Sequence, residues 1–147
     1  MSVFLNKFFV LSSFGVVAGG IASLFGGLDD LIIALLIFML IDFTLGLLVG
    51  AVFKNSPKTE DGRLESYAAW KGLIRKFSVL LLILIAVQLD ILLGVDYIRN
   101  MVIFAFLADE LLSIIENIGL TGIPIPAVVR NAISVLSNKG EVKDETK

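Results

Sequence analysis

The stretch LIIALLIFMLIDFTLGLLVG, residues 31–50, decides how this chain is interpreted. It belongs to an apolar run over residues 31–53 that contains 16 Leu, Ile, Phe or Val residues. Such a run is long enough to cross a hydrocarbon core of roughly 30 Å. A central Asp costs about 2.5 to 3.5 kcal/mol on insertion, whereas each large apolar residue returns roughly 0.3 to 0.6 kcal/mol. The sum favours insertion, so we predict a transmembrane helix that tolerates Asp42.

The composition of the 147-residue chain agrees with a membrane protein. Its hydrophobic fraction is 57%, only 18% of its residues are charged, and its mean hydropathy is +0.95; soluble domains carry about 25% charged residues. Cysteine and histidine are absent, which excludes disulfides, His-ligated metals and Cys-His or Ser-His catalytic pairs. A net charge of −2 does not suggest a nucleic-acid partner. We therefore expect an integral membrane protein, not an enzyme, with no cofactor or metal.

Three further apolar runs predict additional crossings. They cover residues 8–28, 77–95 and 101–118, and the last is the weakest because three acids lie toward its end. If all four runs cross, eleven of twelve basic residues lie on the cytoplasmic side, as the positive-inside rule favours. If residues 8–28 instead lie on the outer face of the membrane, Lys7 is the only basic residue that changes sides. We predict an all-α integral membrane protein of the bacterial cytoplasmic membrane with three to four transmembrane helices, four being favoured.

The polar segments define the remaining parts. Residues 54–76, with six basic and three acidic residues, are predicted to form a cytoplasmic loop that includes a short juxtamembrane helix. Its candidates for membrane-surface contact and topology are Trp70, Lys71, Arg75 and Lys76. A turn shaped by Gly122, Pro124 and Pro126 then precedes a predicted cytoplasmic amphipathic helix over 126–138. Residues 1–138 are thus expected to form one membrane domain, followed by a polar tail, 139–147.

Acidic and amide residues inside the apolar runs are the candidate functional residues, because intramembrane polar groups are by default functional candidates. Asp42, Gly46 and Gly50 share one helical face, predicted to meet other helices or to line a wet lumen. The alternative is that Asp42 pairs within its own subunit, with Thr44 or with a basic residue of a neighbouring helix. Asp90 is a further candidate for oligomerisation or lumen lining.

The fourth run carries a polar face of its own. Glu110, Ser113 and Asn117 are predicted to lie together, opposite Ile114, Ile115 and Ile118. This face could line an oligomeric pore or form hydrogen bonds between subunits. Equally, it could be the solvated face of a helix at the membrane interface.

Small residues recur every four positions in the first run. Because small side chains let helix backbones approach closely in lipid, this stripe predicts helix packing. Its members are Gly15, Gly19, Ser23 and Gly27.

Three stretches taken together resemble the phage lysis and toxin-secretion holins of Gram-positive bacteria and their phages, including the clostridial toxin-export holin. They are Asp42-Phe-Thr-Leu-Gly46; Gly72-Leu-Ile-Arg75-Lys76 with Asp90-Ile-Leu beyond it; and Glu110 to Asn117 followed by Gly122-Ile-Pro124-Ile-Pro126. The resemblance covers roughly residues 31–137. The glycine-rich first run is more hydrophobic than the family pattern, which leaves the number of crossings open.

The resemblance implies a homo-oligomer that opens timed lesions in the cytoplasmic membrane. Such lesions dissipate the membrane potential and release a cytoplasmic endolysin or a large toxin. The partners implied are the lipid bilayer, further copies of the chain and the released cargo. Two other classes stay open: a small ion channel or transporter with Asp42 and Asp90 as ion sites, and a membrane scaffold subunit. A dedicated ion channel is disfavoured because no short, ordered filter signature is visible.

Overall fold

The computed structural model describes residues 2–53, 66–129 and 131, and every regular element in these ranges is helical. The elements are α1 (Ser2–Leu24), α2 (Asp30–Leu48), the π-helix η1 (Val49–Phe53), α3 (Ser66–Leu93) and α4 (Ile98–Leu120). Asp29 caps α2, since its side chain accepts a hydrogen bond from the Ile32 amide at 3.1 Å. η1 continues α2 directly, so the two form one rod over Asp30–Phe53.

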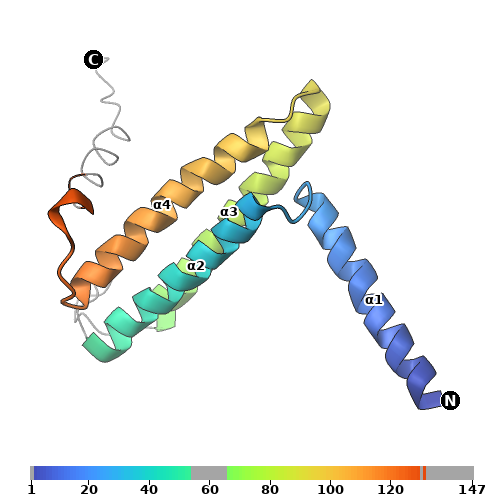
Figure 1. Ribbon diagram of the computed structural model, residues 1–147, viewed down its shortest axis with the longest axis horizontal. Helices are drawn as coiled ribbons and strands as arrows, with labels where there is room; N and C mark the ends of the chain where they lie inside the picture. The colour runs from blue at the N-terminus through green and yellow to red at the C-terminus, as the bar shows by residue number, and fades with distance from the viewer. Residues whose placement is uncertain (1, 54–65, 130, 132–147) are drawn as a thin grey trace.

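Helices α2, α3 and α4 lie side by side as a bundle (Figure 1). Its apolar core comprises Ile32, Leu35 and Met39 of α2, Val79 and Ile83 of α3, and Ile103 of α4. Many large apolar side chains instead point outward: Leu40 is 66% exposed, and Leu92 is 79% exposed. An apolar surface of this extent needs a covering other than water.

Two helices of the described ranges are long and apolar enough to cross a membrane. They are Asp30–Phe53, with 24 residues, and Ser66–Leu93, with 28. At 1.5 Å per residue these rods are about 36 and 42 Å long, which exceeds a hydrocarbon core of roughly 30 Å. The all-helical fold predicted from the sequence is confirmed, and the two apolar helices agree with the predicted membrane location.

Helix α1 diverges from the bundle (Figure 1). On Gly15 and Gly19 an added Cβ would meet no atom within 4 Å, so this part of the small-residue stripe has no packing partner among the described residues. Gly27 lies beyond the end of α1 with φ +101°, a conformation that favours glycine. Within the described residues α1 does not pack along α2, and the prediction that the stripe packs on a helix stays a prediction.

The structure corrects one predicted element. From Ser66 onward no separate juxtamembrane helix precedes the third run, because α3 is continuous from Ser66 to Leu93. The segment YAAWKGLIRK, residues 67–76, contains good helix formers and no proline, so nothing in it ends a helix before the apolar run. Residues 54–65 and most of the predicted C-terminal helix and tail lie outside the described residues.

Candidate functional site: a buried ion network between three helices

Three helices bring charged and polar side chains together inside the bundle. The Lys76 Nζ atom of α3 lies 2.9 Å from Asp42 Oδ2 of α2 and 2.6 Å from Glu110 Oε2 of α4. Asn117 of α4 donates from Nδ2 to Asp42 Oδ1 at 2.9 Å. The side chains of Lys76, Asp42 and Glu110 are 14%, 10% and 9% exposed. We call these four residues the central ion network.

The periodicity of each helix directs its charged residue inward, because residues three, four or seven positions apart share a face. Each member of the network therefore lies on a face that also buries apolar side chains. These are Leu35 and Met39 for Asp42, Val79 and Ile83 for Lys76, and Ile103 and Ile114 for Glu110.

The network lies at the middle depth of the bundle. Asp42 is 12 residues after Asp30 and 11 before Phe53, near the midpoint of the first spanning rod. Because Lys76 and Glu110 are linked to Asp42 through direct hydrogen bonds, they lie at nearly the same depth. Removing one member would leave a buried charge without its partner, which costs about 3 to 5 kcal/mol in proteins.

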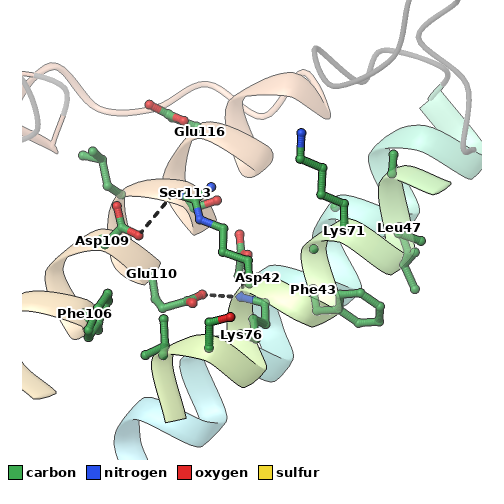
Figure 2. Close-up of a pocket in the computed structure, with 18 of the residues that line it drawn as sticks. Asp42, Phe43, Leu47, Lys71, Lys76, Phe106, Asp109, Glu110, Ser113 and Glu116 are labelled. Carbon is green, nitrogen blue, oxygen red and sulfur yellow. Dashed lines mark hydrogen bonds and ion pairs between the residues drawn. The ribbon is translucent and has the colours of Figure 1, made fainter. Parts of the chain in front are cut away.

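A cleft of about 740 Å³ reaches the network from the end of the bundle where α3 begins. Its lining extends along α3 from Tyr67 to Leu82, a length of about 22 Å at 1.5 Å per residue. Figure 2 shows Glu110 and Lys76 pointing toward each other, whereas Lys71 and Glu116 point away from them. Arg75 and Asp109 form a wider, exposed pair at 4.0 Å on the same cleft. Charged side chains thus line the cleft from its mouth to the central ion network.

A second charged cluster ties the two turns at the opposite end of the bundle. Arg99 donates from Nη1 and Nη2 to the Asp29 carboxylate at 2.6 and 3.0 Å, and from Nε to the Phe25 carbonyl oxygen at 2.6 Å. Asp90 accepts hydrogen bonds from the Ile98 and Arg99 amides at 2.9 and 3.0 Å, and so caps the start of α4. We call Arg99, Asp29 and Asp90 the Arg99 clamp. The hydrogen bonds from Arg99 hold the pKa of Asp29 below its usual value.

The structure places the predicted residues in different roles. Asp42 pairs within its own chain, the alternative that the sequence left open, and its partner is Lys76. Thr44 donates to the Leu40 carbonyl oxygen of its own helix. A Cβ added to Gly46 would lie 4.0 Å from Asn117 Nδ2, so the face shared by Asp42 and Gly46 meets α4. Gly50 is buried in η1.

Two expectations about where side chains lie need correction. Lys76, expected at the membrane surface, is buried at the level of Asp42, because α3 begins at Ser66, eleven residues before the apolar run that starts at residue 77. Ile114 is not opposite the polar face of α4: it is buried between Glu110 and Asn117 on the same face. Ser113 is half-buried and lines the cleft. Trp70 and Lys71 are exposed, as are Gly122, Pro124 and Pro126 after α4.

Sequence reasoning missed the Arg99 clamp. Four crossings leave Arg99 as the one basic residue on the outer side, but this count assigns it no partner. The sequence does contain a signal for this pairing. With four crossings, one arginine and two adjacent aspartates lie in the two short links on the outer side of the membrane. Asp90, predicted as an oligomerisation or lumen candidate, is occupied in the clamp as the cap of α4.

Comparison with known proteins settles the family. The model of the bacteriophage holin family matches residues 19–138. This chain belongs to the bacteriophage holin family. Similar proteins include an uncharacterized protein of Listeria monocytogenes, 34% identical over 92% of this chain and 94% of its own length. A probable holin of Bacillus phage phi105 is 29% identical over 76% of this chain and 77% of its own length.

Relatives of this holin-family chain also occur outside phages. An uncharacterized 14.9 kDa protein of Clostridium perfringens, named for its place in the nagH 3′ region, is 32% identical over 79% of this chain and 83% of its own. No solved structure shows a significant match. The resemblance that the sequence motifs indicated is confirmed.

Proposed function

We propose that this chain is a holin that oligomerises in the bacterial cytoplasmic membrane and opens timed lesions. The lesions dissipate the membrane potential and let a cytoplasmic endolysin or a large toxin pass outward. Family membership and the similarity to a probable phage holin support the general role. The observation that carries the lesion mechanism is the central ion network, because a bundle covered by lipid has little reason to bury three charged side chains for stability alone.

The network supplies polar groups that a lesion needs. In the isolated subunit, Lys76 bridges Asp42 and Glu110, and their charges are largely satisfied inside the bundle. When subunits associate and the helices separate, the same side chains become available to line a water-filled opening. Intramembrane charged groups commonly face a bundle interior or an aqueous cavity for this reason. Asp42 thus pairs in the closed subunit and lines the lumen in the open assembly.

The orientation follows from the positive-inside rule. Residues 54–76 carry six of the twelve basic residues, so the end of the bundle where α3 begins faces the cytoplasm. The cleft then opens to the cytoplasm, and the Arg99 clamp lies at the outer end. With α4 crossing between these ends, the C-terminus is also cytoplasmic.

Inducible expression in bacteria tests this function. A membrane-potential dye should report a delay followed by an abrupt, all-or-none collapse, and a co-expressed cytoplasmic cell-wall hydrolase should then lyse the cells. A steady, ion-selective current without release of the hydrolase would reject the holin function and favour a channel. If the cells lose neither their membrane potential nor the hydrolase, a scaffold subunit is favoured.

The variant Asp42→Asn tests the role of the network in the lesion. It keeps the size of the side chain but removes a charge from the network, so the delay before collapse should change. Asp96→Asn, which removes an exposed carboxylate from the turn after α3, is the matched control and should keep the wild-type delay. Unchanged timing and extent in Asp42→Asn would exclude a gating or lining role for this residue.

A further inference from the structure

Four charged side chains line the cleft without belonging to the central ion network. They are Lys71 and Arg75 of α3 and Asp109 and Glu116 of α4, and all four are exposed. Arg75 and Asp109 form the pair at 4.0 Å. Neither Lys71 nor Glu116 forms an ion pair within the part of the chain that the structure describes. Both point away from the network (Figure 2).

The depth of Lys71 and Glu116 follows from their distance along each helix from the hydrogen-bonded pair Lys76 and Glu110. Helices α3 and α4 run antiparallel (Figure 1). At 1.5 Å per residue, Lys71 therefore lies about 7.5 Å and Glu116 about 9 Å from the level of the network, both toward the end where α3 begins. Half of the hydrocarbon core is about 15 Å thick, so both charges lie within it. Charged groups at such depth face protein or water and pair with one another.

The residues that line the cleft include two rows with the spacing of a helix-packing seam, in which steps of three and four residues alternate. The row on α3 is Ala68, Lys71, Arg75, Ser78 and Leu82. The row on α4 is Phe106, Asp109, Ser113 and Glu116. Gly72 also lines the cleft, and a Cβ added to it would meet no atom within 4 Å. Small residues of this kind let a further helix approach closely in lipid.

A second copy of the chain carries charges that complement this face. Copies of one chain insert with the same orientation, and a two-fold pair uses the same surface of both copies. A two-fold axis perpendicular to the membrane places α3 of one copy opposite α4 of the other. Lys71 then faces Glu116 of the partner subunit at depths that differ by about 1.5 Å. Arg75 faces Asp109 of the partner subunit in the same way, so cations meet anions along the whole seam.

We propose that the cleft between α3 and α4 is the surface through which two copies of this chain pair. In this pair α3 of each copy packs on α4 of the other, and Lys71 and Glu116 form two symmetric contacts between the copies. Pairing removes the charged rim of the cleft from the lipid and gives these side chains opposite charges as neighbours. This inference rests on the proposed oligomerisation and assigns it a specific interface.

Charge reversal tests the contact in vesicles of phosphatidylethanolamine and phosphatidylglycerol. The purified full-length chains carry a donor or an acceptor dye on a cysteine introduced by Asp96→Cys, an exposed position in the turn after α3. The natural sequence has no cysteine, so energy transfer between chains measures pairing alone. Lys71→Glu and Glu116→Lys each place like charges opposite each other twice, and each should weaken pairing by at least about tenfold. Lys7→Glu, which reverses an exposed charge of α1, is the matched control and should pair like the wild type.

Mixing the two reversed chains separates a contact between chains from a contact within one chain. A pair made of one Lys71→Glu chain and one Glu116→Lys chain again has two contacts of opposite charge, so the mixture should recover wild-type energy transfer. Wild-type pairing in both single variants overturns the inference. So does a loss that mixing does not restore, which would assign Lys71 to another partner, such as an anionic lipid headgroup.

Cross-linking covers the case in which a reversed charge impairs insertion into the membrane. Chains with Lys71→Cys and chains with Glu116→Cys, carrying tags of different size, should form a mixed disulfide-linked dimer when bacterial membranes are oxidised. Dimers of like chains only would overturn the inference. The proposed function is judged separately, from the membrane potential. Wild-type chains that pair but never collapse the potential refute the function and support the interface, whereas timed lesions without this pairing refute the interface alone.

Discussion

The central ion network and the Arg99 clamp both join helices through buried cations, but they are built differently. Lys76 touches two side-chain carboxylates of two other helices. Arg99 bonds one carboxylate and, in addition, backbone carbonyl groups of the link between α1 and α2. The network lies near the middle of a spanning rod, whereas the clamp lies at helix ends. Asp29, the acid of the clamp, is 48% exposed at its side chain.

This difference shows how burial changes the cost of losing one partner of an ion pair. Backbone carbonyls and a half-exposed acid leave the clamp tolerant, since solvent can replace a lost partner. The charged side chains of the network are at most 14% exposed, so solvent compensates poorly for the loss of one partner. We therefore expect the clamp to hold the two links together permanently, and the network to be a helix contact that can separate.

The largest expected effect comes from Lys76→Met. Removing the ammonium takes away the cation that bridges Asp42 and Glu110, which should destabilise the bundle by about 3 to 5 kcal/mol. The free energy of unfolding in mixed detergent micelles measures the loss. Adding Glu110→Gln and Asp42→Asn to Lys76→Met should recover most of it, because no buried charge then remains. A triple variant as unstable as Lys76→Met would show that the charges are not the cause.

Arg99→Met should have a smaller effect, about 1 to 3 kcal/mol. The half-exposed Asp29 regains water, but the Phe25 and Gly27 carbonyl groups lose their donor. The link between α1 and α2 should then loosen, which increased amide hydrogen exchange at residues 25–29 would report. Exchange confined to residues far from this link would contradict a clamping role for Arg99.

The pH dependence of the clamp should be smaller still. Arg99 lowers the pKa of Asp29 in the folded protein. The stability that Asp29 contributes is therefore fully present above its unfolded pKa of 3.8 and is lost as pH falls through the lower folded pKa. Below pH 3.8 the thermal unfolding temperature should therefore fall more steeply with pH for the wild type than for Asp29→Asn. Equal acid sensitivity of the two proteins would place the titrating group elsewhere.

Asp109→Asn should have the least effect on stability. It breaks only the exposed pair with Arg75 at 4.0 Å, and exposed pairs contribute about 0 to 1 kcal/mol. The unfolding measurement used for Lys76→Met should give nearly the wild-type value. A loss as large as that of Lys76→Met would show that the Arg75–Asp109 pair is not exposed to water.

Much of the fold could be predicted from the sequence because it depends on local composition. The apolar run at 31–53 is long enough to span a bilayer whatever its neighbours are, and the helical period places Asp42 and Gly46 on one face. The start of α3 was missed because hydropathy marks where the apolar residues begin and not where the helix begins. That difference of about three turns moves Lys76 from the membrane surface to the middle of the bundle.

The sequence by itself determined the helical class, the membrane location, the family and the acids that matter. Only the tertiary structure decided their partners: Lys76 between Asp42 and Glu110, and Arg99 on Asp29, pairs separated by 34 and 70 positions in the chain. The physical reason is that hydropathy and helical period act within one helix. Which face meets which, and at what depth, depends on how three helices share one core.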